Sequence, residues 1–150
     1  MPQLSLHSPI GALTVSEEEG RIVSLDWGWG RDQTRTAALL AAVAALERYF
    51  DGATETFDLP MDPPGTAYQK QVWAVLRAIP FGATLTYAEV AARAGGGPRS
   101  AGNAVGANPI PILIPCHRVL GARSLGGYSG GEGVDTKRYL LALEERLRAG

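Results

Sequence analysis

Three prolines near the middle of the chain constrain its fold more than any other feature. Pro60, Pro63 and Pro64 fall within residues 57–65, and a segment of this kind continues neither a helix nor a central strand. With 150 residues, the chain is long enough for one or two small domains with a genuine core. We therefore expect an N-terminal α/β domain over residues 1–60, a linker over 61–65 and a second domain over 66–150.

The N-terminal part predicts a few strands followed by a helix. Residues 4–7, 13–15 and 21–27 are rich in apolar and β-branched residues, and the last run alternates apolar and polar residues as a half-buried strand does. The acidic segment 17–20 separates the last two runs. Apolar side chains at helical spacing then predict a helix that begins at Thr34 or Thr36 and ends at Phe50. This part offers no catalytic constellation.

The C-terminal part predicts helices over residues 66–79, 86–94, 99–107 and 135–149. The second and third of these, joined by a glycine turn at 95–97, match a helix-turn-helix, although many helix pairs share this pattern. The expected fold class is therefore mixed α/β (α+β): a small strand–helix domain followed by a mostly helical domain.

Composition excludes several classes of protein. Hydrophobic residues make up 45% and charged residues 19% of the chain, as in ordinary soluble proteins. No secretory signal and no apolar run of membrane-spanning length is visible, so we expect a cytoplasmic protein with no membrane partner. Residues 1–61 carry 4 Lys/Arg against 9 Asp/Glu, and residues 62–150 carry 10 against 6. A polyanion would meet the second half, but this modest excess decides little.

Cys116 is the only cysteine of the chain. It cannot form an intrachain disulfide, and with two histidines in the whole sequence a structural zinc site is not expected. His117 and Arg118 follow directly, and groups of this kind favour the nucleophilic thiolate. Neighbouring side chains of an extended segment point to opposite faces, so a link between Cys116 and His117 requires a bend at Pro115 or a bridging water.

The helix predicted over 99–107 consists almost entirely of small residues. Glycines there cost roughly 1 kcal/mol each against alanine, so the composition needs a reason. Close packing against another helix is one explanation. The other is close approach to a DNA groove, with the long side chain of Arg99 entering the base stack. The residues alone do not decide between them.

Glu144 lies within the apolar stripe of the last predicted helix, where an unpaired carboxylate is costly. His117 is one available partner, and would then be oriented as in a nucleophile–base–orienter triad. A partly exposed glutamate paired with Lys137 or Arg148 is the alternative. The glycine-rich segment 126–131 is either a surface linker or a loop whose amides and Ser129 hydroxyl hold a small planar ligand.

Seven segments in the same order closely resemble the O6-alkylguanine-DNA alkyltransferases, also called methylated-DNA–protein-cysteine methyltransferases. They cover nearly all of residues 66–144, and their number makes the resemblance specific. The first domain resembles the N-terminal, RNase H-like domain of that family only in size and strand–helix content. The matching segments are 68–73, 79–82, 86–87, 99–109, 115–119, 128–131 and 140–144.

The resemblance implies irreversible, single-use transfer of the alkyl group of O6-alkylguanine, with O4-alkylthymine as a second substrate, to Cys116. His117 would deprotonate the thiol through a water, Glu144 would orient His117, and Tyr87 would protonate the leaving guanine. Asn108 would brace the active-site turn. Arg99 would fill the space of the flipped base, which decides the question of the small-residue helix in favour of the minor groove, with Ser100, Ala101 and Gly102 at the DNA. Val119, Tyr128 and Ser129 would line the pocket for the base.

The implied partner is double-stranded DNA, bound by a monomer, and neither metal nor organic cofactor is implied. Three rival functions stay open: an alkyltransferase-like protein that binds damage without transfer, a cysteine hydrolase built on Cys116, His117 and Glu144, and a transcription regulator with an inert Cys116. Relatives that bind without transfer replace the acceptor cysteine, which is present here.

Overall fold

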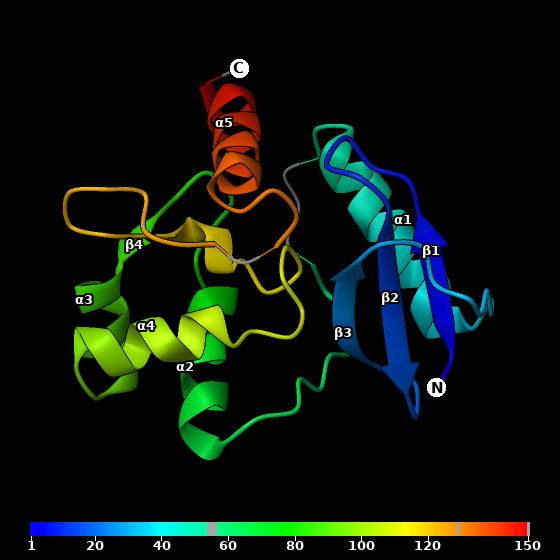
Figure 1. Cartoon of the computed structure of the whole chain (residues 1–150), viewed down its shortest axis with the longest axis horizontal. Coiled ribbons are helices and arrows are strands. Elements are labelled where there is room, and N and C mark those ends of the chain that lie inside the picture. The colour runs from blue at the N-terminus through cyan, green and yellow to red at the C-terminus, as the bar shows by residue number, and fades with distance from the viewer. Residues whose placement is uncertain (54–56, 129, 150) are drawn as a thin grey trace.

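A computed structural model of the chain describes residues 1–53, 57–128 and 130–149. The N-terminal part forms an antiparallel sheet of three strands in the order β1 (Gln3–Leu6), β2 (Leu13–Glu18) and β3 (Arg21–Trp27). The helix α1 (Ala37–Phe50) runs along this sheet (Figure 1). Its buried side chains, among them Leu39, Leu46 and Tyr49, pack toward the core, as the helical spacing of its apolar residues predicts.

The acidic segment 17–20 differs from the prediction, because β2 continues through Glu17 and Glu18 before the chain turns. The tight turn has positive φ at Glu19 (52°) and Gly20 (77°), the backbone of a two-residue hairpin. Glu17 is buried and accepts a hydrogen bond of 2.7 Å from the hydroxyl of Thr36, which also caps α1. A carboxylate can therefore be buried in this strand, since it has a donor from the helix start.

The C-terminal part is mostly helical, as predicted, with α2 (Ala67–Arg77), α3 (Tyr87–Ala94), α4 (Pro98–Gly106) and α5 (Val134–Ala149). Thr66 and Thr86 cap α2 and α3 in capping boxes completed by Gln69 and Glu89. The predicted ends differ from the observed ones by at most two residues. The pair α3 and α4, joined through Gly95–Gly97, forms the expected helix-turn-helix.

Two short strands were not predicted. β4 (Leu85–Thr86) and β5 (Val119–Leu120) pair in parallel and place the start of α3 beside the segment that follows Cys116. Cys116–Arg118 forms a single 3₁₀ turn, η1, between α4 and β5. The pairing thus fixes the position of the Cys116 turn against the helix-turn-helix.

The N-terminal sheet and the C-terminal helices share one hydrophobic core, and backbone hydrogen bonds join them at the edge of β3. Ile22 donates to the carbonyl of Pro60 (2.8 Å) and accepts from the amide of Asp62 (2.8 Å). Leu25 donates to the carbonyl of Pro109 (2.9 Å), in the segment that leads to Cys116. Among the described residues, no helix is both long enough and apolar enough to cross a membrane.

Candidate active site

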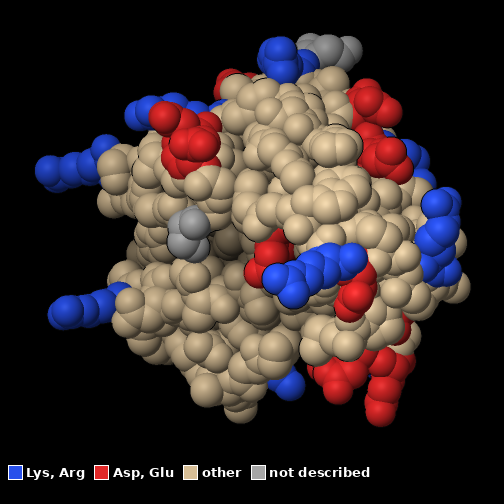
Figure 2. Space-filling view, turned by 45° about the vertical axis from the view of Figure 1, so that its right-hand side comes forward, with Lys and Arg blue, Asp and Glu red and all other residues tan. Residues whose placement is uncertain are grey.

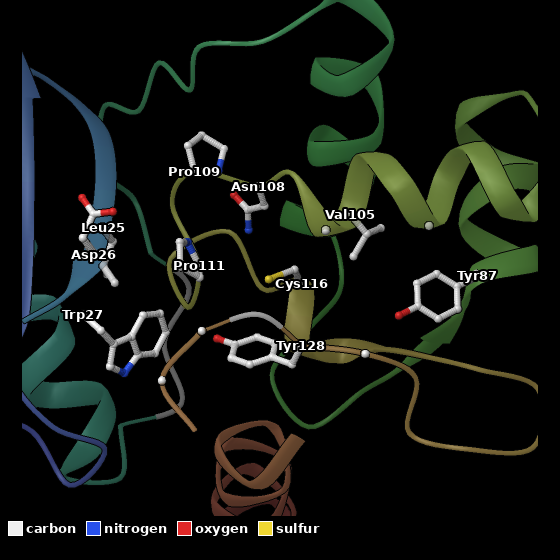
Figure 3. Close-up of a pocket in the computed structure, with 15 residues that line it drawn as sticks. Leu25, Asp26, Trp27, Tyr87, Val105, Asn108, Pro109, Pro111, Cys116 and Tyr128 are labelled. Carbon is white, nitrogen blue, oxygen red and sulfur yellow. The ribbon is translucent and has the colours of Figure 1, made fainter. Parts of the chain in front are cut away.

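A cavity of about 720 Å³ opens between β3 and the C-terminal helices, and the sulfur of Cys116 points into it (Figure 3). This volume is typical of small-molecule sites. One wall comes from the N-terminal sheet and the other from α3, α4 and the glycine-rich loop. The described residues that line it are Leu25, Asp26, Trp27, Tyr87, Gly102, Val105, Gly106, Asn108, Pro109, Pro111, Cys116, Gly127, Tyr128, Gly130 and Gly131.

The segment before Cys116 is held by the side chain of Asn108. Its amide nitrogen donates to the carbonyl of Ile114 (2.8 Å), and its side-chain oxygen accepts from the amide of Ile110 (3.0 Å). Between these contacts Ile112 has a φ of 72°, a left-handed conformation that is rare and costly for a β-branched residue. The side chain of Asn108 therefore links both ends of the segment that leads to Cys116, the turn that the resemblance implies it would brace.

The 3₁₀ turn solves the geometric problem posed by adjacent Cys116 and His117. Because the backbone bends at Pro115, the thiol lies at the cavity while the imidazole of His117 lies fully buried behind it. The Nε2 atom of His117 lies 2.5 Å from Oε2 of Glu144. Nδ1 has no hydrogen-bond partner among the described protein atoms and is the nitrogen left to take up a proton.

Glu144 is 1% exposed and is the centre of a polar cluster. Besides His117, its carboxylate accepts from Nε of Arg118 (2.8 Å to Oε1), from Nη2 of Arg118 (3.2 Å to Oε2), from the hydroxyl of Tyr49 (2.6 Å to Oε2) and from the amide of Gly82 (3.3 Å to Oε1). Glu144 does not pair with Lys137, whose ammonium donates elsewhere. The side chain of Arg148 lies outside the described residues.

The cluster sets the protonation states of the pair. Burial alone would raise the pKa of Glu144. The hydrogen bonds of His117 and Arg118, the charge of Arg118 and the charge of His117 where it is protonated, at acid pH, outweigh this effect and lower the pKa to about 2. Burial lowers the pKa of His117 below its ordinary value, the carboxylate of Glu144 opposes this, and the charges of Arg118 and Lys137 add to it. At neutral pH the pair is a neutral imidazole beside a carboxylate, which suits a proton acceptor.

The expectation that Arg118 favours the thiolate of Cys116 is wrong. The guanidinium of Arg118 is turned to Glu144 and to the carbonyl of Ile79 (2.8 Å), because a buried carboxylate satisfies more of its donors than a thiol does. Burial raises the pKa of the Cys116 thiol, and the Asn108 side chain and the charge of Lys137 only partly oppose this. The thiol is therefore protonated at rest and needs a base.

Lys137 and the tyrosines complete the pocket. The buried ammonium of Lys137 donates to the carbonyls of Val119 (2.7 Å) and Gly127 (3.0 Å) and so ties the glycine-rich loop to β5. Tyr87 and Tyr128 both line the cavity, and burial raises the pKa of each phenol, so each carries its proton at neutral pH. Val119, which was expected to line the pocket, is fully buried and is not among the lining residues; its carbonyl accepts the hydrogen bond from Lys137. Ser129 lies outside the described residues.

The helix α4 presents the residues predicted to meet DNA. Arg99 and Ser100 are exposed at its start, Gly102 is half-buried, and Ala101 is buried against the other helices, so it does not face outward as expected. Figure 2 shows acidic side chains gathered at the lower right, where the β2–β3 turn of Figure 1 lies, and a few basic side chains projecting from the left edge, on the side of the C-terminal part. Both features considered for the small residues of α4 are therefore present. One face of the helix packs against other helices, and the opposite face is exposed and carries no bulky side chain at Ser100 and Gly102.

The part that three polar residues play in the site was not predicted from the sequence. Tyr49 has the sequence pattern of a core residue of α1. The burial of Lys137 and the contact of Arg118 with Glu144 were also not predicted. Asp135, Thr136 and Arg138 surround Lys137 in the sequence, so the only local sign of its burial is the helical spacing to Leu140, three residues on. Among the described residues, no three His, Cys, Asp or Glu side chains come together as a metal site would require.

Comparisons with known proteins cover both parts of the chain. Residues 67–146 match the family model described as "6-O-methylguanine DNA methyltransferase, DNA binding domain", and residues 4–63 match its "ribonuclease-like domain". Methylated-DNA–protein-cysteine methyltransferases of Methanosarcina barkeri and Haemophilus influenzae are 40% and 39% identical, over 93% and 92% of this chain and 94% and 83% of theirs. The crystal structure of Mycobacterium tuberculosis OGT in complex with DNA superimposes with a TM-score of 0.87 at 38% identity, over 98% of this chain and 94% of that one.

Proposed function

The chain belongs to the 6-O-methylguanine DNA methyltransferase family, and from this premise we propose that it repairs O6-alkylguanine in double-stranded DNA by moving the alkyl group to its own Cys116. One observation carries the proposal: a buried thiol that opens into a cavity large enough to admit a base, with a neutral imidazole and a carboxylate directly behind it. O4-alkylthymine is a second substrate of the same chemistry.

His117 acts as the base in this scheme. Glu144 accepts the Nε2 hydrogen, so Nδ1 carries the lone pair and takes the thiol proton of Cys116 through an intervening water. The imidazolium that forms is stabilised by the carboxylate of Glu144, which the donors of Arg118 keep ionised. The raised pKa of the thiol makes this step necessary.

The thiolate then attacks the alkyl carbon in line with the C–O bond. A sulfur–carbon bond forms, the carbon–oxygen bond breaks, and its electron pair goes to the guanine, which Tyr87 protonates as it leaves. Tyr87 holds its proton in the pocket, and its hydroxyl is directed toward the side on which Cys116 lies (Figure 3). The thioether has no route back, so each molecule reacts once.

Access to a base in duplex DNA requires base flipping, and α4 supplies the surface for it. We assign Arg99 to the space that the base leaves and the smooth, exposed side of α4, with Ser100 and Gly102, to the minor groove. Tyr128 and Ser129 belong to the pocket wall. In this scheme the second domain (66–150) binds DNA and carries the reactive Cys116. The N-terminal domain (1–60) supports it, and residues 61–65 link the two. The protein works as a monomer in the cytosol, where its single thiol stays reduced.

Intact-mass spectrometry after mixing with a duplex that contains O6-methylguanine tests the proposal. We expect one methyl adduct per molecule, on the peptide that contains Cys116, and none in Cys116→Ala, which should still bind the duplex. A cysteine hydrolase would turn over instead of stopping at one equivalent. A regulator with an inert Cys116 or a protein that only binds damage would leave the mass unchanged, and either result would refute the proposal.

A further inference from the structure

The hydroxyl of Tyr49 shares an oxygen of Glu144 with His117. It donates to Oε2 at 2.6 Å, and Nε2 of His117 lies 2.5 Å from the same oxygen. Tyr49 belongs to α1, 95 residues before Glu144, and is 2% exposed. It is thus the one side chain of the N-terminal part among the hydrogen-bond partners described for Glu144.

Tyr49 can act only as a donor in this contact. Burial, followed by the charge and the hydrogen bond of Glu144, raises the pKa of its phenol far above the ordinary value. A donor on a carboxylate oxygen withdraws charge from that oxygen, which then accepts less strongly from a second donor. The imidazolium form of His117 therefore receives less support from Glu144 than it would without the phenol.

We propose that Tyr49 is a positioning residue of the proton relay, whose hydroxyl limits how far Glu144 raises the basicity of His117 and so keeps the imidazole neutral and ready to accept the thiol proton. The proposal gives the N-terminal helix a part in the chemistry, beyond support of the fold. In its kinetic consequences it rests on the alkyl transfer proposed above.

The charged and titratable groups around the relay come from several elements. Arg118 of η1 contacts Glu144 and lies 5.7 Å from the ring centre of Phe81, Lys137 of α5 acts on His117 through its charge, Cys116 precedes His117, and Tyr128 of the glycine-rich loop acts on Tyr49. Burial raises the pKa of the two phenols and of the thiol, so these three groups stay protonated in the range in which His117 titrates. A change in the titration on removal of the Tyr49 hydroxyl therefore reports the lost donor.

Tyr49→Phe removes only the hydroxyl. The ring of Tyr49 packs against Phe50, Phe57 and Phe81 at centroid distances of 5.2, 5.6 and 6.0 Å, and phenylalanine keeps these contacts. Tyr139→Phe is the matched control, because Tyr139 lies on α5 with Glu144 but is not among its hydrogen-bond partners.

The first readout is an NMR titration of the imidazoles in the DNA-free protein. The chain has only two histidines, and exposed His7, stacked on Trp29, serves as the internal reference. We expect the pKa of His117 to rise by about one unit in Tyr49→Phe, the size of one hydrogen bond to a charged group. It should stay unchanged in Tyr139→Phe.

If Tyr49→Phe does not fold, a second variant that should change the pKa of His117 in the opposite direction still tests the inference. 3-Fluorotyrosine at position 49 is a stronger donor with nearly the same shape, so the pKa of His117 should fall. An unchanged His117 titration in either folded variant of position 49 overturns the inference, because a tyrosine that only packs would leave it in place.

The second readout is the pH dependence of alkyl transfer. The acidic limb of the pH–rate profile should move to higher pH in Tyr49→Phe. The rate of alkyl transfer should fall by about tenfold at pH values below the pKa of His117 and by less than about threefold above it. If the unaltered protein forms no adduct, the proposed function fails, while the NMR titration still decides the inference. If it forms the adduct and the limb does not move in Tyr49→Phe, only the inference fails.

Discussion

Replacement of Glu144 by glutamine should remove a pH-dependent share of the stability. The carboxylate is 1% exposed and accepts from four residues. Two of them, His117 and Arg118, outweigh the effect of burial and lower its pKa from 4.5 in the unfolded chain to about 2. A difference of this size corresponds to about 3 kcal/mol in the free energy of unfolding. Since the folded pKa is the lower one, this stabilisation is present above about pH 4.5 and disappears as the pH falls through about 2.

Glutamine is the matched neutral replacement, because its amide, like a protonated carboxyl, is uncharged, has nearly the same shape and combines an acceptor oxygen with a donor group. Glu144→Gln should therefore unfold about 3 kcal/mol more easily at pH 7, a decrease in Tm of roughly 6–12 °C for a chain of this length, and equally easily near pH 2. The difference at neutral pH is large because the guanidinium of Arg118, 6% exposed, loses its counterion.

Urea unfolding at several pH values between 2 and 7 measures this difference directly. The two curves of unfolding free energy should converge toward acid pH. Curves that stay parallel, or a variant as stable as the unaltered protein at pH 7, would show that the donors around Glu144 do not stabilise its charge, and the account of the cluster would be wrong. The same variant should also transfer the alkyl group more slowly, because His117 loses the acceptor that orients it.

Three further changes test other parts of the site. Arg99→Ala should slow repair of duplex DNA with little change in stability, and leave the reaction with the free modified base unaffected; equal slowing on both would argue against a role in base flipping. Lys137→Met should raise the pKa of the Cys116 thiol, because the positive charge of Lys137 stabilises the thiolate. The pH dependence of alkylation with iodoacetamide measures this pKa, and an unchanged value would show that Lys137 does not act on Cys116. Gly126→Ala should lower the free energy of unfolding by more than about 1 kcal/mol, because Gly126 has a φ of 74° and a Cβ there would lie 2.7 Å from the Tyr87 hydroxyl. Gly127→Ala is the control: its Cβ would meet no atom within 4 Å, so thermal unfolding should show almost no change in stability.

The helices could be predicted from the sequence because their signals are local. Thr36, Thr66 and Thr86 each cap a helix, and apolar spacing then marks its buried face. The parallel pair of β4 and β5 carries no such signal, since two-residue strands more than thirty residues apart show no periodicity. The pattern also failed at Glu17, because a partner on the following helix made a buried carboxylate acceptable.

The site shows the same division between local and distant information. Cys116 and His117 are neighbours in the chain, and the position of Glu144 on an apolar helix face indicates that it needs a partner. These signals made His117 one candidate partner, but they also left Lys137 and Arg148 open, and the structure decides between His117 and Lys137. Tyr49 could not be identified, because a tyrosine at a core position of α1 has no local feature that distinguishes a buried donor from a packing residue. The orientation of Arg118 depends on which acceptor the fold brings near, and neighbouring residues in the sequence do not reveal it.

The hydrogen bonds along the outer edge of β3 also bear on the solubility of the protein. An open strand edge invites pairing with another polypeptide, but here the carbonyl of Pro60, the amide of Asp62 and the carbonyl of Pro109 occupy donors and acceptors of Ile22 and Leu25. The segment that leads to the reactive sulfur thus also shields a strand from intermolecular contact. Any change that detaches this segment from the sheet would favour aggregation as well as loss of activity.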